Sequence, residues 1–144
     1  MIVLDIALSA LCIYLYRRGN RCAYTKLLNK AQFNRDIKKR MRRKSDIIVL
    51  IDIDKFKQIN DTHGHAYGDN VIKDLADVIR REIRVSDRAY RIGGDEFAVI
   101  TSDASVTDRI KKAAGTPISV GCGSTYEEAD ANMYTNKSLH NLYN

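Results

Sequence analysis

The 144-residue sequence has no tryptophan, a single proline and only three phenylalanines. It also has no glycine-rich or serine-rich stretch, no low-complexity tract and no internal repeat. These absences argue against a flexible linker between separate domains. The length suits one domain of ordinary size, and a 44% share of hydrophobic residues is enough for a core. We therefore predict one globular domain preceded by a short N-terminal segment.

Cysteine is also scarce. Cys12, Cys22 and Cys122 are odd in number and form no CxxC pair, which argues against a disulfide framework or a zinc site and favours a reducing cytoplasm. Acidic residues number 18 against 24 basic ones, so the formal net charge is +6. This balance favours anionic partners such as nucleotides, nucleic acid or anionic lipid without choosing among them.

The longest apolar run covers residues 1–16 and is followed by Arg17 and Arg18. As a helix it would reach about 24 Å, less than the hydrocarbon core of about 30 Å, although positive charges after it favour a cytoplasmic position for the rest. The run also carries an apolar stripe at helical spacing, formed by Ile2, Ile6, Ser9, Ile13 and Tyr16. Two alternatives remain open: an inner-membrane anchor and a helix that pairs two chains. In both, residues 1–21 form an N-terminal helix and residues 22–144 the main domain.

The main domain opens with a predicted helix, because Asn29 and Gln32 have the spacing of a capping box and Phe33 and Ile37 lie on one face. A basic run over residues 38–44 follows. No aromatic residues interleave this run, so it is typical of a solvated helix face and nucleic acid is not an expected partner.

An apolar, β-branched run over residues 47–51 predicts a strand buried on both faces. It ends in Asp52-Ile53-Asp54, and carboxylates at the C-terminal edge of such a strand lie where α/β folds bind ligands. Asp54 has an alternative role as a helix cap. Asp52 is the better candidate ligand, because an unpaired charge inside the strand end would be costly.

A second acidic site follows Gly93 and Gly94. The two glycines before Asp95 and Glu96 predict a tight hairpin turn, since glycine accepts backbone angles that other residues resist, and an apolar strand over residues 97–100 follows. Adjacent carboxylates repel each other unless a metal ion or a proton neutralises one. We therefore predict a metal site at this turn.

Between these sites, residues 60–69 are rich in turn formers, which predicts a loop rather than a helix interior. His63 and His65 lie within it, but without a third ligand they are a weak metal motif. Asp69 is a candidate N-cap for the next helix, which is predicted from apolar residues Val71, Ile72, Leu75, Ile79 and Ile83. Further along, the sequence predicts a helix over 105–114 capped by Ser105 and Asp108, a strand over 117–122 and a helix opened by a capping box at Thr125 and Glu128.

Three blocks together resemble the GGDEF domain family, the diguanylate cyclases that join two GTP molecules into cyclic di-GMP. They are Gly93-Gly94-Asp95-Glu96-Phe97; residues 52–61, which resemble DxDxFKxxND; and residues 60–69, which resemble NDxxGHxxGD. The resemblance spans residues 22–144. It implies an α/β, palm-like domain of the α+β type, with a central, mainly antiparallel sheet flanked by helices.

The resemblance also implies roles for individual residues. The metal, Mg²⁺ or Mn²⁺ because the ligands are hard oxygens, would be bound by Asp52, the Ile53 carbonyl and Asp95. Glu96 would support a second metal or take the proton from the attacking hydroxyl. The resemblance assigns substrate binding to Phe56, Lys57 and Lys137 and guanine binding to Asn60 and Asp69. It also implies an RxxD product-inhibition site at Arg84 and Asp87.

The implied guanine site agrees with simple chemistry. A carboxylate such as Asp69 can accept hydrogen bonds from N1–H and the exocyclic amine of guanine, whereas adenine would present its N1 acceptor to the negative charge. A site that depends on this pairing rejects the wrong base by leaving buried polar groups unpaired. GTP is therefore favoured over ATP.

The function implied is that of a diguanylate cyclase in a cyclic di-GMP signalling system, acting as a homodimer. The alternative is a catalytically silent receptor that binds cyclic di-GMP at the RxxD site, or GTP. Three departures from the family pattern favour that alternative: Cys22 replaces an acidic residue, Asn141 replaces a phosphate-binding arginine, and the segment after the GGDEF turn is short.

Overall fold

The computed structural model describes residues 2–40, 43 and 45–142. The elements in chain order are α1 (Ile2–Gly19), β1 (Leu28–Asn29), α2 (Lys30–Arg40), β2 (Ile47–Ile53), α3 (Phe56–His63), α4 (His65–Glu82), β3 (Arg88–Arg91), β4 (Glu96–Thr101), α5 (Val106–Ala113), β5 (Ile118–Gly123) and α6 (Tyr126–Leu142).

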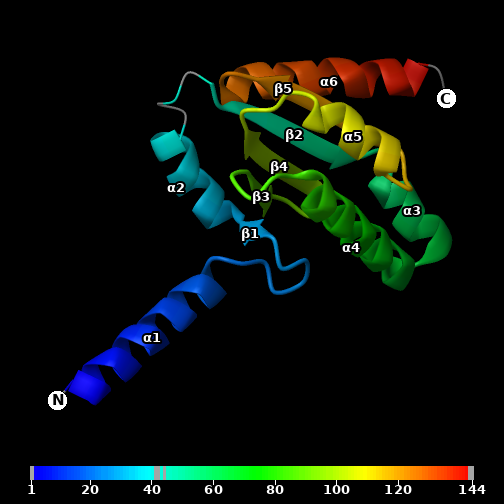
Figure 1. Cartoon of the computed structure of the whole chain (residues 1–144). Coiled ribbons are helices and arrows are strands. Elements are labelled where there is room, and N and C mark those ends of the chain that lie inside the picture. The colour runs from blue at the N-terminus through cyan, green and yellow to red at the C-terminus, as the bar shows by residue number, and fades with distance from the viewer. Residues whose placement is uncertain (1, 41–42, 44, 143–144) are drawn as a thin grey trace.

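The strands form one sheet in the order β1-β3-β4-β2-β5, with the helices packed around it (Figure 1). Strand β2 pairs antiparallel with β4 and β5, and β3 pairs antiparallel with β4. Only the short β1 runs parallel to its neighbour β3. The predicted fold, a mainly antiparallel sheet flanked by helices, is therefore confirmed.

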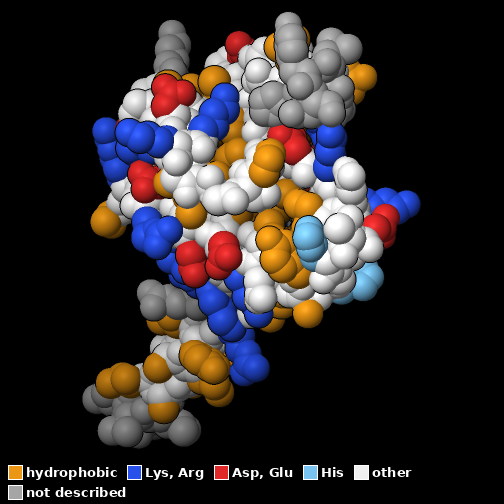
Figure 2. All heavy atoms as spheres, turned by 90° about the vertical axis from the view of Figure 1, so that its right-hand side faces the viewer, with side chains coloured by type: hydrophobic (Ala, Val, Ile, Leu, Met, Phe, Trp, Pro, Cys, Tyr) orange, Lys and Arg blue, Asp and Glu red, His pale blue; other side chains and the backbone are white. Residues whose placement is uncertain are grey.

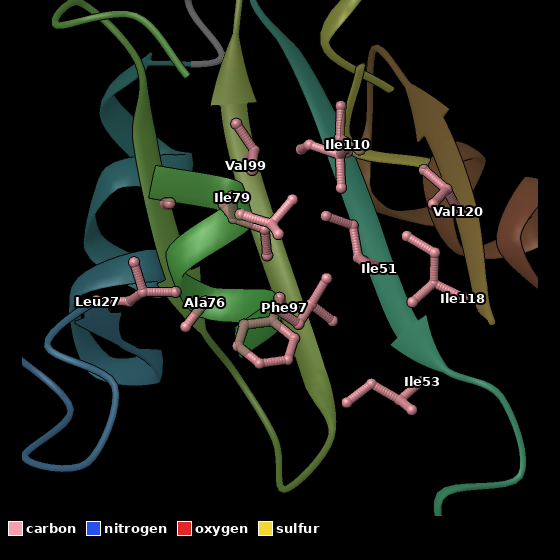
Figure 3. Packing of buried hydrophobic residues seen from close by; sticks show 14 of the residues in the cluster. Leu27, Ile51, Ile53, Ala76, Ile79, Phe97, Val99, Ile110, Ile118 and Val120 are labelled. Carbon is pink, nitrogen blue, oxygen red and sulfur yellow. The ribbon is translucent and has the colours of Figure 1, made fainter. Parts of the chain in front are cut away.

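Side chains alternate along the buried strand β2 and supply two cores. Val49, Ile51 and Ile53 face α4 and α5, and Figure 3 shows Ile51 beside Ile110 of α5. Ile48 and Leu50 point to the other face, against α2 and α6. The predicted burial of this strand on both faces is confirmed. By the same alternation, Asp52 lies on the α6 side.

The prediction that residues 60–69 form a loop is wrong. They lie in α3 and α4, and only Gly64, with φ +87°, separates the two helices. A single residue in the left-handed region is enough to end one helix and redirect the chain, so the neighbouring turn formers stay helical. Asp69 consequently lies inside α4 and does not cap it.

The predicted caps have mixed outcomes. The Gln32 amide donates to Asn29 Oδ1 (3.0 Å) and the Glu128 amide to Thr125 Oγ1 (3.2 Å), which confirms both caps. The caps assigned to Asp54 and Ser105 are wrong, because α3 and α5 start without a side-chain cap. Before α5, the side chain of Asp103 instead accepts a hydrogen bond from the Ser105 amide (3.1 Å). This bond satisfies a backbone N–H at the start of the helix that has no partner within the helix.

Helix α1 projects from the body of the domain (Figure 1). Its apolar side chains are open to solvent, with Ile6, Leu11 and Ile13 exposed by 63%, 50% and 54%. Figure 2 shows hydrophobic side chains on the lower, projecting part of the molecule. In the part of the chain that the structure describes, no helix has the length and apolar character needed to cross a membrane.

Candidate functional site

The structure places the three predicted metal ligands at the end of the interior strand β2 and in the turn before β4. Asp52 lies near the end of β2, where its Cα pairs with those of Glu96 in β4 and Ser119 in β5. The next residue, Ile53, donates its amide to the backbone oxygen of Asp95 (3.3 Å). This hydrogen bond ties the turn before β4 to the end of β2, so two segments more than 40 residues apart contribute to one site.

The Asp52 carboxylate is buried and already has a counter-ion. Lys137 of α6 places Nζ 2.7 Å from Asp52 Oδ1. Burial raises the pKa of Asp52, the Lys137 contact opposes this rise, and the negative charges of Asp95 and Asp54 add to it. The hydrogen bond to Asp52 in turn raises the pKa of Lys137, and the charges of Asp95 and Asp54 act in the same direction. The ammonium group therefore lies in a field created by three carboxylates.

This group of residues suits a hard divalent cation. Within the described residues, no three His, Cys, Asp or Glu side chains form a cluster able to hold a metal ion. The predicted set needs only two carboxylates, Asp52 and Asp95, and completes its oxygen donors with the Ile53 carbonyl. Since Asp52 is buried and negative, a bound cation would replace Lys137 as its counter-charge.

Of the two glycines of the turn, only Gly93 occupies a position where a side chain would clash, and the reason differs from the one the sequence suggested. Neither Gly93 nor Gly94 has a positive φ. A Cβ at Gly93 would lie 2.4 Å from Glu96 Oε2, whereas a Cβ at Gly94 would meet nothing within 4 Å. Gly93 therefore gives the Glu96 side chain room to fold back over the turn. Gly94 leaves open space beside Asp95.

Asn60 and Asp69 come together at the junction of α3 and α4. A Cβ at Gly68 would lie 1.8 Å from Asn60 Oδ1 and 3.3 Å from Phe56 Cζ, so the two helices approach as closely as a glycine allows. Asn60 Oδ1 is buried and has no hydrogen-bond partner, while Asp69 is exposed. A buried acceptor without a partner is costly, and a ligand that donates a hydrogen bond would remove that cost.

The other predicted residues lie further from this junction. Lys57 is exposed on the first turn of α3. Arg84 and Asp87 close the turn after α4, where Asp87 Oδ2 accepts from the Arg84 amide (2.9 Å) and the Arg84 guanidinium reaches Asp103 (2.9 Å). Both side chains of the RxxD motif therefore already have intramolecular partners. The side chain of Asn141 lies outside the described part of the structure.

The sequence analysis missed a group of residues around Arg91. This guanidinium donates to the backbone oxygen of Gly94 through Nη2 (2.6 Å) and Nε (3.2 Å), and its Nη1 lies 3.6 Å from Cys22 Sγ. It also lies 5.3 Å from the ring centre of Tyr24. Arg91 lies two residues before Gly93, and this closeness in sequence was the signal that could have pointed to the group.

The contacts of Cys22 change its acidity. Burial raises its pKa, but hydrogen bonds from Thr25, Arg91 and the Tyr24 amide outweigh that effect and lower the pKa to about 7. A thiolate is therefore well populated near neutral pH. Cys22 occupies the position at which the family pattern has an acid, and it retains part of the negative charge.

Comparisons with known proteins agree with this geometry. Residues 23–120 match the family model described as diguanylate cyclase, GGDEF domain. Diguanylate cyclase DgcS from Shewanella oneidensis is 31% identical over 93% of this chain and 52% of its own length. The coiled coil and GGDEF domain of DgcB from Caulobacter crescentus, solved in complex with c-di-GMP, is similar with a TM-score of 0.83 and 26% identity over 95% of this chain and 90% of that chain.

A second solved structure, diguanylate cyclase SiaD from Pseudomonas aeruginosa in complex with its activator SiaC, has a TM-score of 0.78 and 28% identity, covering 94% of this chain and 65% of that one. The chain spans about half the length of DgcS, 52%, and only 20% to 29% of the next curated relatives that it matches.

Proposed function

We propose that this chain, which belongs to the GGDEF domain family, is a diguanylate cyclase that joins two molecules of GTP into cyclic di-GMP and releases pyrophosphate. The observation that carries the proposal is the convergence of Asp52 and Asp95 at the end of β2, held by the hydrogen bond from the Ile53 amide to the Asp95 backbone oxygen. Nearby, α3 and α4 supply polar groups suited to a base, so one edge of the domain offers both halves of a nucleotide site.

In this proposal a divalent ion, Mg²⁺ or Mn²⁺, would be held by Asp52, Asp95 and the Ile53 carbonyl, with Glu96 beside them. The ion would lower the pKa of the attacking 3′-hydroxyl and screen charge on the α-phosphate. Lys137, whose Nζ now contacts Asp52, would be released toward the negative phosphates, where lysine acts as a mobile point charge. Glu96 is exposed, so its carboxylate can accept a proton from the attacking hydroxyl.

Guanine would be selected by Asn60 and Asp69. The unpartnered Asn60 Oδ1 needs a donor, and the exposed Asp69 carboxylate can accept from N1–H and the exocyclic amine. Adenine cannot provide this set of donors, so its binding would leave Asn60 or Asp69 unsatisfied. Phe56 packs beneath this junction, next to Gly68, and Lys57 would add positive charge at the start of α3.

Two chains would be needed for the reaction, because each GTP attacks the other. We assign residues 1–21 to pairing and residues 22–144 to the cyclase domain. The exposed apolar side chains of α1 support this assignment. The substitutions Ile6→Asp and Ile13→Asp together should convert a dimer to a monomer in sedimentation experiments and abolish product formation, while the GTP affinity of each chain persists.

The proposal is tested by incubating the full chain with Mg²⁺ and GTP, ATP or both, and identifying the products by chromatography and mass spectrometry. We expect cyclic di-GMP from GTP alone and at least a hundredfold less product from Asp95→Asn, a change that preserves the size of the side chain. Asp108→Asn, at an exposed position of α5, is the matched control and should keep wild-type activity. An active Asp95→Asn variant, or an inactive wild-type dimer, would contradict the proposal.

A silent receptor is the second candidate function, and the exposure of Arg84 supports it, because 61% of this side chain remains available to an anionic ligand. The variant Arg84→Ala distinguishes a receptor from an enzyme. A receptor would lose cyclic di-GMP binding. An enzyme would keep its initial rate and lose only inhibition by its product.

A further inference from the structure

Tyr24 lies between the proposed guanine site and the glycine turn. It belongs to the segment between α1 and β1, and its ring is flanked by Lys73 Nζ of α4 at 4.6 Å and by the Arg91 guanidinium at the end of β3 at 5.3 Å from the ring centre. Cations over an aromatic face are attracted by its negative charge density, so both contacts hold the ring in place. A ring held from two elements has little freedom to move when a ligand binds.

The hydroxyl of Tyr24 is buried and makes no hydrogen bond of good geometry, although Asp69 is close enough to raise its pKa. Asp69 lies one helical turn before Lys73 on α4, and Lys73 is the residue that contacts the Tyr24 ring. Burial is the largest cause of the raised pKa of Tyr24; hydrogen bonding to the Asp69 carboxylate and its negative charge raise the pKa further, and Arg91 opposes the rise. The hydroxyl thus stays protonated and can act as a donor. Asp69 is exposed, so its side chain can rotate toward this donor at little cost.

We propose that Tyr24 is a positioning residue for guanine selection: its hydroxyl donates a hydrogen bond to Asp69 when nucleotide binds and fixes the orientation of that carboxylate toward the base. The inference rests on the proposed role of Asp69 in binding guanine. A carboxylate has about four acceptor positions, so Asp69 can accept from Tyr24 and still accept from N1–H and the exocyclic amine. Without Tyr24, the exposed Asp69 would have to be ordered by the ligand itself, which weakens binding.

The same ring is linked to the turn through Arg91. Arg91 lies over Tyr24 and donates twice to the Gly94 backbone oxygen, so the residue that orients Asp69 also restrains the turn that carries Asp95. The charged and titratable groups around Tyr24 are Asp69 and Lys73 of α4, Arg91 of β3, and Cys22, Arg21 and Lys26 of its own segment.

The test compares Tyr24→Phe with Tyr134→Phe, which removes the same hydroxyl from a side chain that is 73% exposed on α6. The probes are the α,β-methylene analogues of GTP, ITP and ATP with Mg²⁺, which cannot release pyrophosphate, and the readouts are calorimetric affinity and thermal unfolding without nucleotide. ITP lacks the exocyclic amine. The ratio of GTP-analogue to ITP-analogue affinity therefore reports how well Asp69 is oriented.

We expect Tyr24→Phe to weaken GTP-analogue binding by about tenfold, in line with loss of one hydrogen bond to a charged group, and to reduce the GTP-to-ITP ratio. Thermal stability without nucleotide should be unchanged or higher, because the lost hydroxyl is buried and makes no hydrogen bond of good geometry. A residue that merely supports the fold would instead show a lower stability and an unchanged ratio.

The outcomes separate this inference from the function on which it rests. If the wild-type chain prefers the GTP analogue and Tyr24→Phe keeps the wild-type affinity and ratio, the inference is wrong and the guanine assignment stands. If the wild-type chain binds GTP and ATP analogues equally, the guanine assignment fails and the inference fails with it. Neither result depends on cyclase activity.

Discussion

The two halves of the proposed nucleotide site differ in how their polar groups are satisfied. At the end of β2, Asp52 is buried against Lys137, with Nζ and Oδ1 only 2.7 Å apart. At the junction of α3 and α4, Asn60 Oδ1 is buried without a partner, and the buried hydroxyl of Tyr24, in the segment before β1, makes no hydrogen bond of good geometry. The buried charge of Asp52 is therefore compensated by a residue of the same chain. The buried acceptor of Asn60 needs a ligand to complete its hydrogen bonding.

This difference indicates what each half requires of a ligand. A cation at Asp52 must compete with an ammonium group, so binding there is an exchange of counter-ions and gains only the difference between them. A base at Asn60 displaces no protein partner and provides a missing donor, so binding also removes the free-energy cost of the unpaired acceptor. We expect base recognition to be largely preformed and metal recognition to require movement of Lys137.

The largest effect should come from filling the space between α3 and α4. In Gly68→Ala the new Cβ would lie 1.8 Å from Asn60 Oδ1, so the Asn60 side chain must move. We expect affinity for the α,β-methylene GTP analogue to fall by about a hundredfold, because base contacts at both Asn60 and Asp69 are disturbed. The stability cost should be small, since a flexible side chain yields and alanine favours a helix.

Gly19→Ala is the control for this change, because a Cβ there meets nothing within 4 Å. It should leave nucleotide affinity at the wild-type value. Wild-type affinity in Gly68→Ala would show that the base half is not preformed around Asn60.

A smaller effect should follow from removing the counter-ion at the other half. Lys137→Met leaves Asp52 buried without its partner, and we expect the free energy of unfolding to fall by about 1–2 kcal/mol in metal-free buffer, a reduced value because Lys137 is 41% exposed. Chemical denaturation measures this loss. Added Mg²⁺ should recover part of it, and Lys112→Met on the exposed face of α5 should show no loss.

The double variant Asp52→Asn, Lys137→Met sharpens the comparison. It removes both charges, so it should be more stable than Lys137→Met alone and should gain nothing from Mg²⁺. Equal stability of the single and double variants would mean that the ion pair does not satisfy Asp52.

The smallest effect concerns pH and the Cys22 contact with Arg91. The pKa of Cys22 is about 7 in the folded chain, below its ordinary value of 9.0, so between these values the unfolded chain binds more protons and stability rises with pH. Below pH 7 this contribution is lost. We expect the stability difference between the wild type and Cys22→Ser to grow by less than about 1 kcal/mol from pH 7 to pH 9, since the thiol is half-buried.

Denaturation midpoints at pH 6, 7, 8 and 9 measure this difference. Cys12→Ser, at an exposed position on α1, is the control and should show a constant difference across the same range. A flat profile for Cys22→Ser would mean that Arg91 does not stabilise the thiolate.

Local patterns in the sequence were sufficient for much of this protein. The buried strand β2, the acids at its C-terminal end and the turn before β4 were predictable because apolar β-branched runs are typical of buried strands and glycines are typical of turns. The same holds for the cap at Asn29 and for the apolar face of α4. The family resemblance then joined acids that are distant in sequence into one site.

The tertiary structure decided what local preference could not. It made residues 60–69 helical, because packing of α3 on α4 at Gly68 outweighs their turn propensity. It paired Lys137 with Asp52 across 85 residues and left the hydroxyl of Tyr24 beside Asp69. Such contacts depend on which helix faces which strand, a relation that no short stretch of sequence contains, since the burial that fixes these partners arises only when the sheet and its helices assemble.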